Sequence, residues 1–491
     1  MLAVSYLAVG RHTYSSNPDT RPLAQNTPHL YSGLRIKGRP TAGMNEHYSS
    51  TSSRQHLLGP MQQTSLSLYT SGNKPLAKTD DRATAPTKYG PLTRTTYVLA
   101  ILIPVTTALN LKTHGIRIDV TLVLLALLTT LPGSARQARA GRLRLYIVAI
   151  TFSAIIAASA LYNPWLLVSY DARLLGMTLL AFLLYRRISG HDRDWQALTY
   201  GILLASASAA LQVYTTPLDT PNIVFQDNQG FTRVITTEGP VFLVSGAALA
   251  FLLLVSHSAP RRLRLGLLLT TIISMIELFR TQTRGYIFAV AIVIVLLLPA
   301  AIKHSLALTP KRPRRAAAQG IRLVLGIVVA LGAALAYLNR TLSSGSRTSI
   351  APNSSIQLRI DEIHAQISQQ GWDIGVGRGL GGQFRTPIGP YPSLLTTWAH
   401  NGFMWWSLKL GAAIGAYVGY ATFVRPLVYL YGPSRSTYHE FNTTMSAAIG
   451  LLSVGVISLT SNQFTLYGGA YLLGACSGII SRRQPDGQWK P

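Results

Sequence analysis

Runs of apolar residues follow one another from about residue 95 to near the end of the chain. Each run is close to the roughly 20 residues that a helix needs to cross the hydrocarbon of a bilayer. Hydrocarbon offers no partner for an unpaired backbone amide, and the runs are too long and uniformly apolar for barrel strands, so each predicts a helix. We expect an all-α bundle of about twelve spans. They lie near residues 95–110, 116–132, 145–162, 166–185, 197–214, 240–256, 263–279, 285–302, 321–338, 402–424, 440–460 and 463–480.

Residues 1–90 differ in composition, being rich in Ser, Thr, Asn, Gln, Pro and Gly. They contain no apolar pattern long enough to bury a core, so we expect a disordered tail. This tail is either a cytoplasmic appendage or translated upstream sequence without a function. The sequence therefore predicts two parts, the tail 1–90 and a polytopic membrane domain 91–491.

The overall composition fits a membrane protein, with 48% hydrophobic and 12% charged residues, against roughly one quarter charged in soluble domains. The net charge of +27 comes from basic residues in short segments between the apolar runs. Such segments act as orientation signals, so nucleic-acid binding is not expected. Cys476 is the single cysteine, which excludes an internal disulfide and a Cys-based zinc site.

Basic residues follow every even-numbered span, and the positive-inside rule assigns these ends to the cytoplasm. The groups begin at Arg136, Arg186, Arg261, Lys303, Arg425 and Arg482. Both termini are then cytoplasmic, and the odd-numbered exits face outward. The substantial outward segments are 215–239, the short link 280–284 and a hydrophilic stretch, 339–401, between spans nine and ten.

Most of the charges on the outward segments are arginines, which is unusual for that side. Guanidinium groups hold phosphate oxygens through paired hydrogen bonds, so they suit a lipid-linked phosphate; binding of lipid headgroups is the alternative for each of them. Arg280 and Arg284 either share one helical turn or sit in a tight turn. The arginines that we consider as site residues are Arg233, Arg280, Arg284, Arg359 and Arg378.

Within 339–401, isoleucines recur with helical spacing at Ile356, Ile360, Ile363 and Ile367. Ser354 and Gln357 could open this helix as a capping box, and Gly371 would close it. We expect the helix to lie along the membrane surface with Arg359, Glu362 and Gln366 on its other faces. Packing of the loop onto the bundle is an equally good interpretation for Glu362.

His400 and Asn401 stand where the loop meets span ten. A neutral imidazole there could accept a proton from an attacking sugar hydroxyl, and Asn401 could cap the helix. The glycine-rich segment 375–382 predicts a tight turn whose amides could also bind an anion. Asp171, near the outer end of span four, requires a partner elsewhere. Paired metal-ligand and Walker motifs are missing from the sequence, so no metal or cofactor is expected.

Three segments together resemble the superfamily of O-antigen ligases and Wzy-type polysaccharide polymerases. Thr283-Arg284-Gly285 resembles its Ser-Arg-Gly, Arg359 followed by Gly375-Val376-Gly377 resembles its large-loop segment, and His400-Asn401 with Phe403, Met404 and Gly411 resembles its His-Asn motif. The sequence departs from the family pattern at three places. Lys409 stands where an acid is common, Ile363 where an aromatic residue is common, and no Asn-Pro-Asn follows Arg233.

The resemblance implies a GT-C-like fold and a metal-independent, inverting glycosyltransferase of the bacterial inner membrane. It would transfer a glycan from an undecaprenyl-pyrophosphate carrier to an acceptor hydroxyl at the periplasmic face. His400 and Arg284 would be catalytic, and the residues that bind substrate would be Arg233, Arg280, Arg359, Arg378 and Asn401. The acceptor would be a glycan for a polymerase or a lipid A core for a ligase, and the sequence leaves both open. A polysaccharide flippase or other transporter is the alternative from another class, and it would require ionisable groups near the midplane.

Overall fold

The computed structural model describes fourteen segments, all within the unit Tyr89–Pro491. They are residues 94–113, 116–130, 135–189, 194–216, 224–226, 232–234, 238–256, 261–280, 284–308, 326, 352–386, 395–397, 399–431 and 438–482. The predicted tail 1–90 lies outside the described residues, as does the predicted span 321–338 apart from Gly326.

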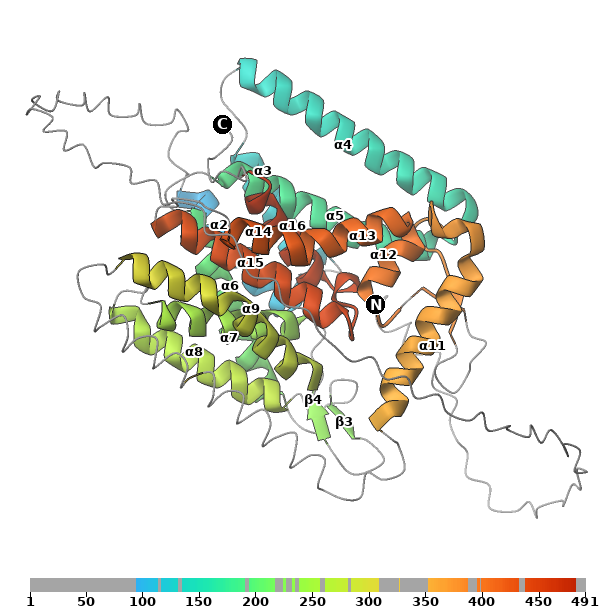
Figure 1. Cartoon of the computed structure of the whole chain (residues 1–491). Coiled ribbons are helices and arrows are strands. Elements are labelled where there is room, and N and C mark those ends of the chain that lie inside the picture. Colours follow the sequence, from blue (N-terminus) through green and yellow to red (C-terminus); the bar gives the residue numbers. More distant parts are fainter. Residues whose placement is uncertain are drawn as a thin grey trace, which may run out of the picture. The chain divides into compact units, whose positions relative to one another are not determined.

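The described residues are mostly helical, as predicted (Figure 1). The helices are α2 (Arg94–Ala108), α3 (Ile118–Thr129), α4 (Ala135–Tyr162), α5 (Trp165–Ile188), α6 (Asp194–Thr215), α7 (Gly239–Val255), α8 (Arg261–Arg280), α9 (Arg284–Leu308), α11 (Pro352–Gln370), α12 (Gly402–Leu410), α13 (Ala412–Gly419), α14 (Arg425–Tyr431), α15 (Tyr438–Ser458) and α16 (Tyr467–Ile480). Shorter helical segments are η1 (Gly371–Ile374), η2 (Tyr420–Val424, a π-helix) and η3 (Gln463–Thr465).

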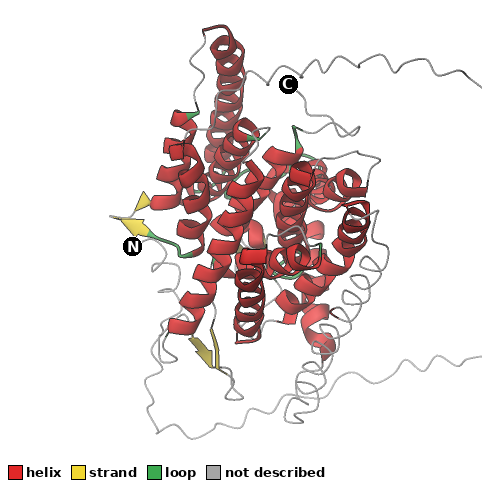
Figure 2. Ribbon diagram, turned by 90° about the vertical axis from the view of Figure 1, so that its left-hand side faces the viewer, coloured by secondary structure: helices red, strands yellow, loops and turns green. Residues whose placement is uncertain are grey.

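Short antiparallel strand pairs lie outside the helices (Figure 2). They are β1 (Lys112–Thr113) with β2 (Ile116–Arg117), β3 (Val224–Gln226) with β4 (Thr232–Val234), and β5 (Phe384–Arg385) with β6 (Leu395–Thr396). Arg233 is opposite Phe225 in the second pair.

Four helical segments in the described part of the chain are long and apolar enough to cross a membrane: Trp165–Ile188, Gln196–Thr215, Gly285–His304 and Phe441–Ser458. Shorter apolar helices accompany them, including α2, α3, α7 and α16. These helices occupy ranges in which the apolar pattern predicts spans.

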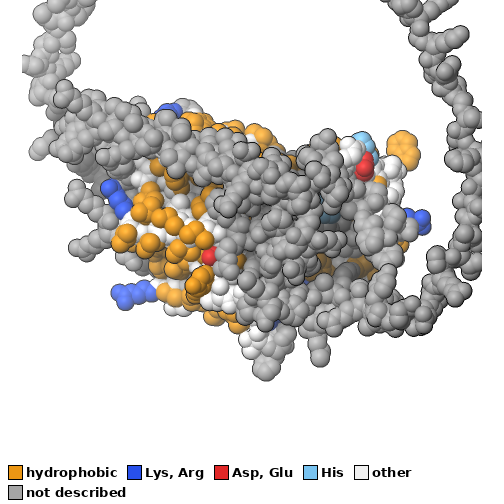
Figure 3. All heavy atoms as spheres, turned by 90° about the horizontal axis from the view of Figure 1, so that it is seen from below, with side chains coloured by type: hydrophobic (Ala, Val, Ile, Leu, Met, Phe, Trp, Pro, Cys, Tyr) orange, Lys and Arg blue, Asp and Glu red, His pale blue; other side chains and the backbone are white. Residues whose placement is uncertain are grey.

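The core of the bundle contains α7 and α15, which are buried along nearly their whole length. By contrast, α8 carries an exposed apolar stripe, with Leu265, Leu268, Ile272 and Ile276 spaced three or four residues apart. Apolar side chains also gather on the face seen in Figure 3, with Lys and Arg near its margins. A helix that is apolar on both its buried and its exposed side is typical of a membrane segment.

The predicted single span 402–424 is wrong, because the helix reverses direction at Gly411. Gly411 has a φ of 90°, a conformation that favours glycine. A Cβ on Gly415 would lie 2.1 Å from the Ser407 Oγ, and one on Gly419 would lie 3.8 Å from the ring of Phe403. α12 and α13 therefore form an antiparallel helical hairpin, with glycines that allow close approach.

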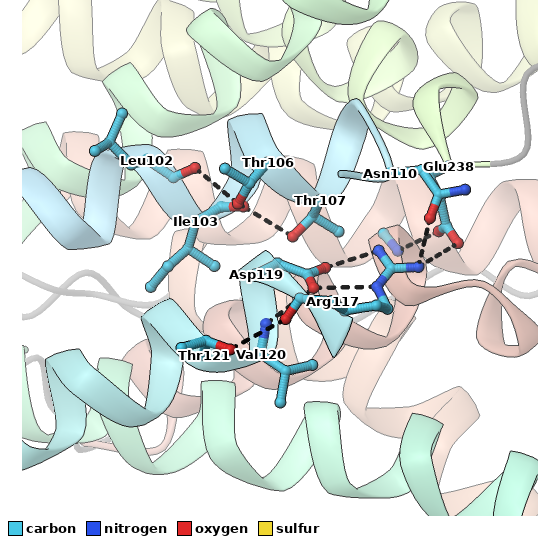
Figure 4. A network of polar contacts seen from close by, with 11 residues as sticks. Leu102, Ile103, Thr106, Thr107, Asn110, Arg117, Asp119, Val120, Thr121 and Glu238 are labelled. Carbon is cyan, nitrogen blue, oxygen red and sulfur yellow. Dashed lines mark hydrogen bonds and ion pairs between the residues drawn. The ribbon is translucent and has the colours of Figure 1, made fainter. Parts of the chain in front are cut away.

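A buried polar network joins the ends of α2, α3, α7 and α16 (Figure 4). Arg117 binds Asp119 through two hydrogen bonds, of 3.0 and 2.8 Å, and also contacts Asn110 and Glu238. The second oxygen of Glu238 accepts a 2.8 Å hydrogen bond from the amide of Gly468. Burial raises the pKa of Glu238, and the charge of Arg117 opposes that shift.

Candidate functional site

The predicted loop helix is present as α11, and its end is correctly predicted. Gly371 follows the helix with a φ of 52° and starts η1. The predicted start is wrong, because α11 begins at Pro352 and Ser354 lies inside its first turn. Proline suits the first turn of a helix, since its missing N–H would have no partner there.

The buried side of α11 is polar. Glu362, Gln366 and Gln370 are only 3%, 0% and 2% exposed, and their spacing of four residues puts them on one face. Ile360 and Ile367, on another face, are 39% and 42% exposed. α11 therefore packs onto the bundle through polar side chains and keeps part of its apolar stripe outside, as expected for a helix along a membrane surface.

α11 runs beside α12 in the same direction. Glu362 contacts His400, and the Gln366 amide donates a hydrogen bond to the Met404 carbonyl. The His400 Nδ1 lies 3.0 Å from the Glu362 Oε2, and the backbone N–H of His400 donates to the same oxygen at 3.2 Å. The His400 side chain is 28% exposed, so the carboxylate is buried while the imidazole reaches the surface.

Arg359 precedes Glu362 by one turn of α11. Its Nη1 is buried, without a hydrogen-bond partner in the described structure. Burial lowers the pKa of Arg359 and the nearby Glu362 carboxylate opposes this shift, but a guanidinium remains charged at any physiological pH. An unused, partly desolvated donor of this kind favours an anionic ligand.

Asn401 caps α12, accepting hydrogen bonds from the amides of Phe403 and Met404 at 3.0 and 3.1 Å. This is the structural role that the sequence indicated. Its side-chain amide also reaches the carbonyl of Leu459, at 3.4 Å.

The start of α9 lies beside the same segment, because a Cβ on Gly285 would be 3.0 Å from the Thr460 Oγ1. Arg284 is the first residue of α9, and Arg280 is the last of α8. The two arginines thus belong to different helices, which excludes the first of the two alternatives, a shared helical turn. The side chains of Arg233, Arg280 and Arg284 lie outside the described part of the structure.

The amides of residues 378–381 in the glycine-rich turn have partners within the protein. The amides of Arg378 and Gly379 donate to two carbonyls in the last turn of α12, those of Leu408 and Lys409, at 2.7 and 3.0 Å. The next two amides, of residues 380 and 381, donate to side chains of α4 and α5 at 2.9 and 2.7 Å. The turn therefore supplies hydrogen-bond donors to carbonyls at the end of α12 that have no partner within the helix. The predicted anion contact is wrong for these amides.

Arg378 also makes internal contacts. Its guanidinium donates to the carbonyls of Gln383 and Gln369, and its Nε lies 3.5 Å from the Asp373 carboxylate. The described contacts of this side chain stabilise the loop, and its predicted role in binding substrate stays a prediction.

Asp171 finds its partner in Lys409. The Lys409 Nζ lies 2.9 Å from the Asp171 Oδ2 and donates to the Gly382 carbonyl at 2.7 Å. The same carboxylate oxygen accepts the amide of Gly381. Lys409 is therefore half of a buried ion pair, and it holds the glycine-rich turn against α5.

His400 is a candidate site residue by sequence, but its contact with Glu362 was not predicted. The only available signal was the position of Glu362 one turn after Arg359, on a face that the isoleucine spacing left polar. Comparison with models of known protein families and with curated protein sequences found no match to this chain.

Proposed function

We propose that the chain is a membrane-embedded glycosyltransferase of the O-antigen ligase and Wzy-type polymerase class, with a GT-C-like bundle of about twelve spans. Its donor is a glycan on undecaprenyl pyrophosphate, and its acceptor is a hydroxyl of a second glycan or of a lipid A core. The resemblance of its three sequence segments to that superfamily supports the substrate class.

Long-range contacts support the alternating topology, because they join ends that the sequence assigns to the same side. Contacts between predicted outer ends are Arg117–Glu238 at 3.3 Å, Asn163–Arg378 at 2.8 Å and Tyr170–Thr465 at 2.9 Å. Contacts between predicted inner ends are Thr96–Thr129 at 2.9 Å and Arg482–Arg186 at 3.2 Å. In an alternating bundle these pairs would each share one membrane face.

The observation that carries the proposal is the closeness of three features: the imidazole of His400, the partly desolvated guanidinium of Arg359, and the first turn of α9, which begins with Arg284. His400 and Arg359 both neighbour Glu362, and Asn401 reaches the 459–460 segment beside which α9 begins at Arg284. A sugar-diphosphate donor requires cationic groups at the diphosphate and a base at the acceptor.

In the proposed reaction, the acceptor oxygen attacks the anomeric carbon of the donor glycan. A carbon–oxygen bond forms there while the bond to the pyrophosphate breaks, and the hydroxyl proton passes to His400. Arg284 and Arg359 offset the charge that the departing pyrophosphate gains. A single displacement inverts the anomeric carbon, and the donor is already activated, so the scheme uses no cofactor.

The test uses a bacterial host in which the gene is deleted and variants are expressed from a plasmid. His400→Ala and Arg284→Ala should abolish transfer, whereas His364→Ala and Arg385→Ala, which change exposed residues of the same loop, should not. Lipid-linked glycans are analysed by mass spectrometry, and membrane insertion is checked by immunoblotting. Single repeat units on the carrier would indicate a lost polymerase, and long carrier-bound chains a lost ligase. Normal glycans in both alanine variants would refute the proposed function.

A further inference from the structure

One buried carboxylate holds both the backbone and the ring of His400. The Glu362 Oε2 lies 3.2 Å from the His400 amide nitrogen and 3.0 Å from its Nδ1. The Glu362 Oε1 lies 3.4 Å from the same amide. Since the backbone N–H can only donate, the carboxylate acts as an acceptor here, and the Nδ1 contact is best satisfied when that nitrogen carries a proton.

We propose that Glu362 is a positioning residue that keeps the proton of neutral His400 on Nδ1, so that Nε2 accepts the proton of the acceptor hydroxyl. This inference rests on the proposed function. A carboxylate in this place does three things: it selects the tautomer, fixes the ring and stabilises the imidazolium that forms during attack.

The energetics favour an ionised, paired Glu362. A buried carboxylate is costly unless hydrogen bonds and a nearby cation compensate for its lost hydration. Here the compensation comes from the two donors of His400 and from Arg359, whose charge acts on Glu362 from one helical turn away. The buried Glu362 carboxylate therefore depends on His400 for hydrogen-bond donors, and His400 depends on Glu362 for an acceptor.

The described surroundings contain few competing charges. On α11 the relevant groups are Arg359 and Glu362 themselves, whereas Asp361 contacts Gln357 instead. On α12 the charged residue is Lys409, which is paired with Asp171. The segment 459–465 that contacts Asn401 contains no charged residue.

The proton balance follows from this arrangement. The acceptor hydroxyl loses its proton to Nε2 as the new glycosidic bond forms. The bond between the anomeric carbon and the pyrophosphate breaks, and its electron pair leaves with the pyrophosphate. The imidazolium then keeps its Nδ1 proton against Glu362 and releases the Nε2 proton to water. Glu362 itself does not change protonation state.

The experiment compares Glu362→Gln, Glu362→Asp and Glu362→Ala with the matched control Asp361→Asn on the same helix. The first readout is the ¹⁵N spectrum of histidine-labelled full-length protein in lipid nanodiscs, with His400 assigned by its loss in His400→Ala. Wild type and Asp361→Asn should show the Nδ1-protonated tautomer. Glu362→Ala should shift His400 toward the Nε2-protonated form that prevails in water.

The second readout is steady-state transfer, with undecaprenyl-pyrophosphate-linked oligosaccharide extracted from the deletion strain as the donor. Glu362→Gln keeps the shape but loses the charge, so its kcat should fall on the order of 10²-fold while KM changes little. Glu362→Asp should recover part of kcat, and Asp361→Asn should match wild type.

The outcomes distinguish the role of Glu362 from the proposed function. An unchanged His400 tautomer in Glu362→Ala, or an unchanged kcat in Glu362→Gln, overturns the role of Glu362 even when His400→Ala is inactive. Full activity of His400→Ala overturns the proposed function instead. If Glu362→Ala does not fold, the tautomer is compared in Glu362→Leu, which fills the space of the side chain but offers no acceptor to Nδ1.

Discussion

Removing the lysine of the buried Asp171–Lys409 pair should undock the glycine-rich turn. Lys409→Met leaves the Asp171 carboxylate with the amide of Gly381 as its remaining described partner and deprives the Gly382 carbonyl of its donor. Breaking a buried ion pair from one side costs about 3–5 kcal/mol, because the remaining charge is uncompensated. At about 1.4 kcal/mol for each factor of ten, the undocked population should rise by about two to three and a half orders of magnitude.

The double variant Asp171→Asn with Lys409→Met should be more stable than Lys409→Met alone. The asparagine oxygen can still accept the Gly381 amide, and no charge is left buried. What remains is the hydrogen bond lost at the Gly382 carbonyl, about 1–3 kcal/mol. This reversed order, in which a second substitution restores stability, does not depend on the absolute magnitudes.

Trypsin provides the assay, because Arg378 lies in the turn and its bond to Gly379 is protected only while the turn is docked. When opening and closing are fast, the cleavage rate follows the population of the open form. Cleavage after residue 378 is followed by mass spectrometry in detergent. Lys112→Met, which removes an exposed lysine, is the matched control. Cleavage of the double variant as fast as that of Lys409→Met would refute the reasoning.

Three further outcomes are expected. Gly377→Ala should release the same turn, since φ is 79° and a Cβ would lie 2.5 Å from a facing backbone nitrogen, whereas Gly266→Ala, whose Cβ meets nothing within 4 Å, should leave trypsin resistance unchanged. Burial raises the pKa of Glu238, so the folded protein binds the Glu238 proton more tightly than the unfolded chain does. Stability should therefore fall as pH rises from the unfolded pKa through the folded pKa. Thermal unfolding of Glu238→Gln should depend less on pH than that of the wild type, and an identical pH dependence would contradict this sign. Tyr185→Phe should lower the unfolding temperature by removing the hydroxyl that bonds Tyr471 at 2.6 Å, at a cost of about 1–3 kcal/mol, and an unchanged temperature would show that this bond contributes nothing.

The apolar runs predicted the positions of the helices because a backbone in hydrocarbon has to pair its own N–H and C=O groups, whatever the surrounding contacts. The same rule failed over 402–424, where Gly411 interrupts an apolar run without changing its hydropathy. What turns the chain there is the glycine-rich turn, whose amides end α12 by binding its carbonyls. This contact between the glycine-rich turn and α12 joins segments that are distant in the sequence, so no local sequence pattern predicts it.

The candidate site was predictable where one residue type has few uses. An imidazole at a helix start and arginines on the outward side drew attention by themselves. Glu362 did not, because a carboxylate on an amphipathic helix normally faces water, and only the packing of α11 on α12 reveals its burial. Lys409 likewise looked like a departure from a pattern until Asp171 supplied its counter-charge.

The network around Arg117 has an evolutionary consequence. Its guanidinium is shared among Asn110, Asp119 and Glu238, and Glu238 in turn fixes the first turn of α16. A drifting sequence cannot exchange one of these side chains without stranding the others in a dry environment. Among diverged descendants of this chain, substitutions at the positions of Arg117, Asp119 and Glu238 should therefore arise together, as a matched replacement of all three ionised groups by uncharged ones.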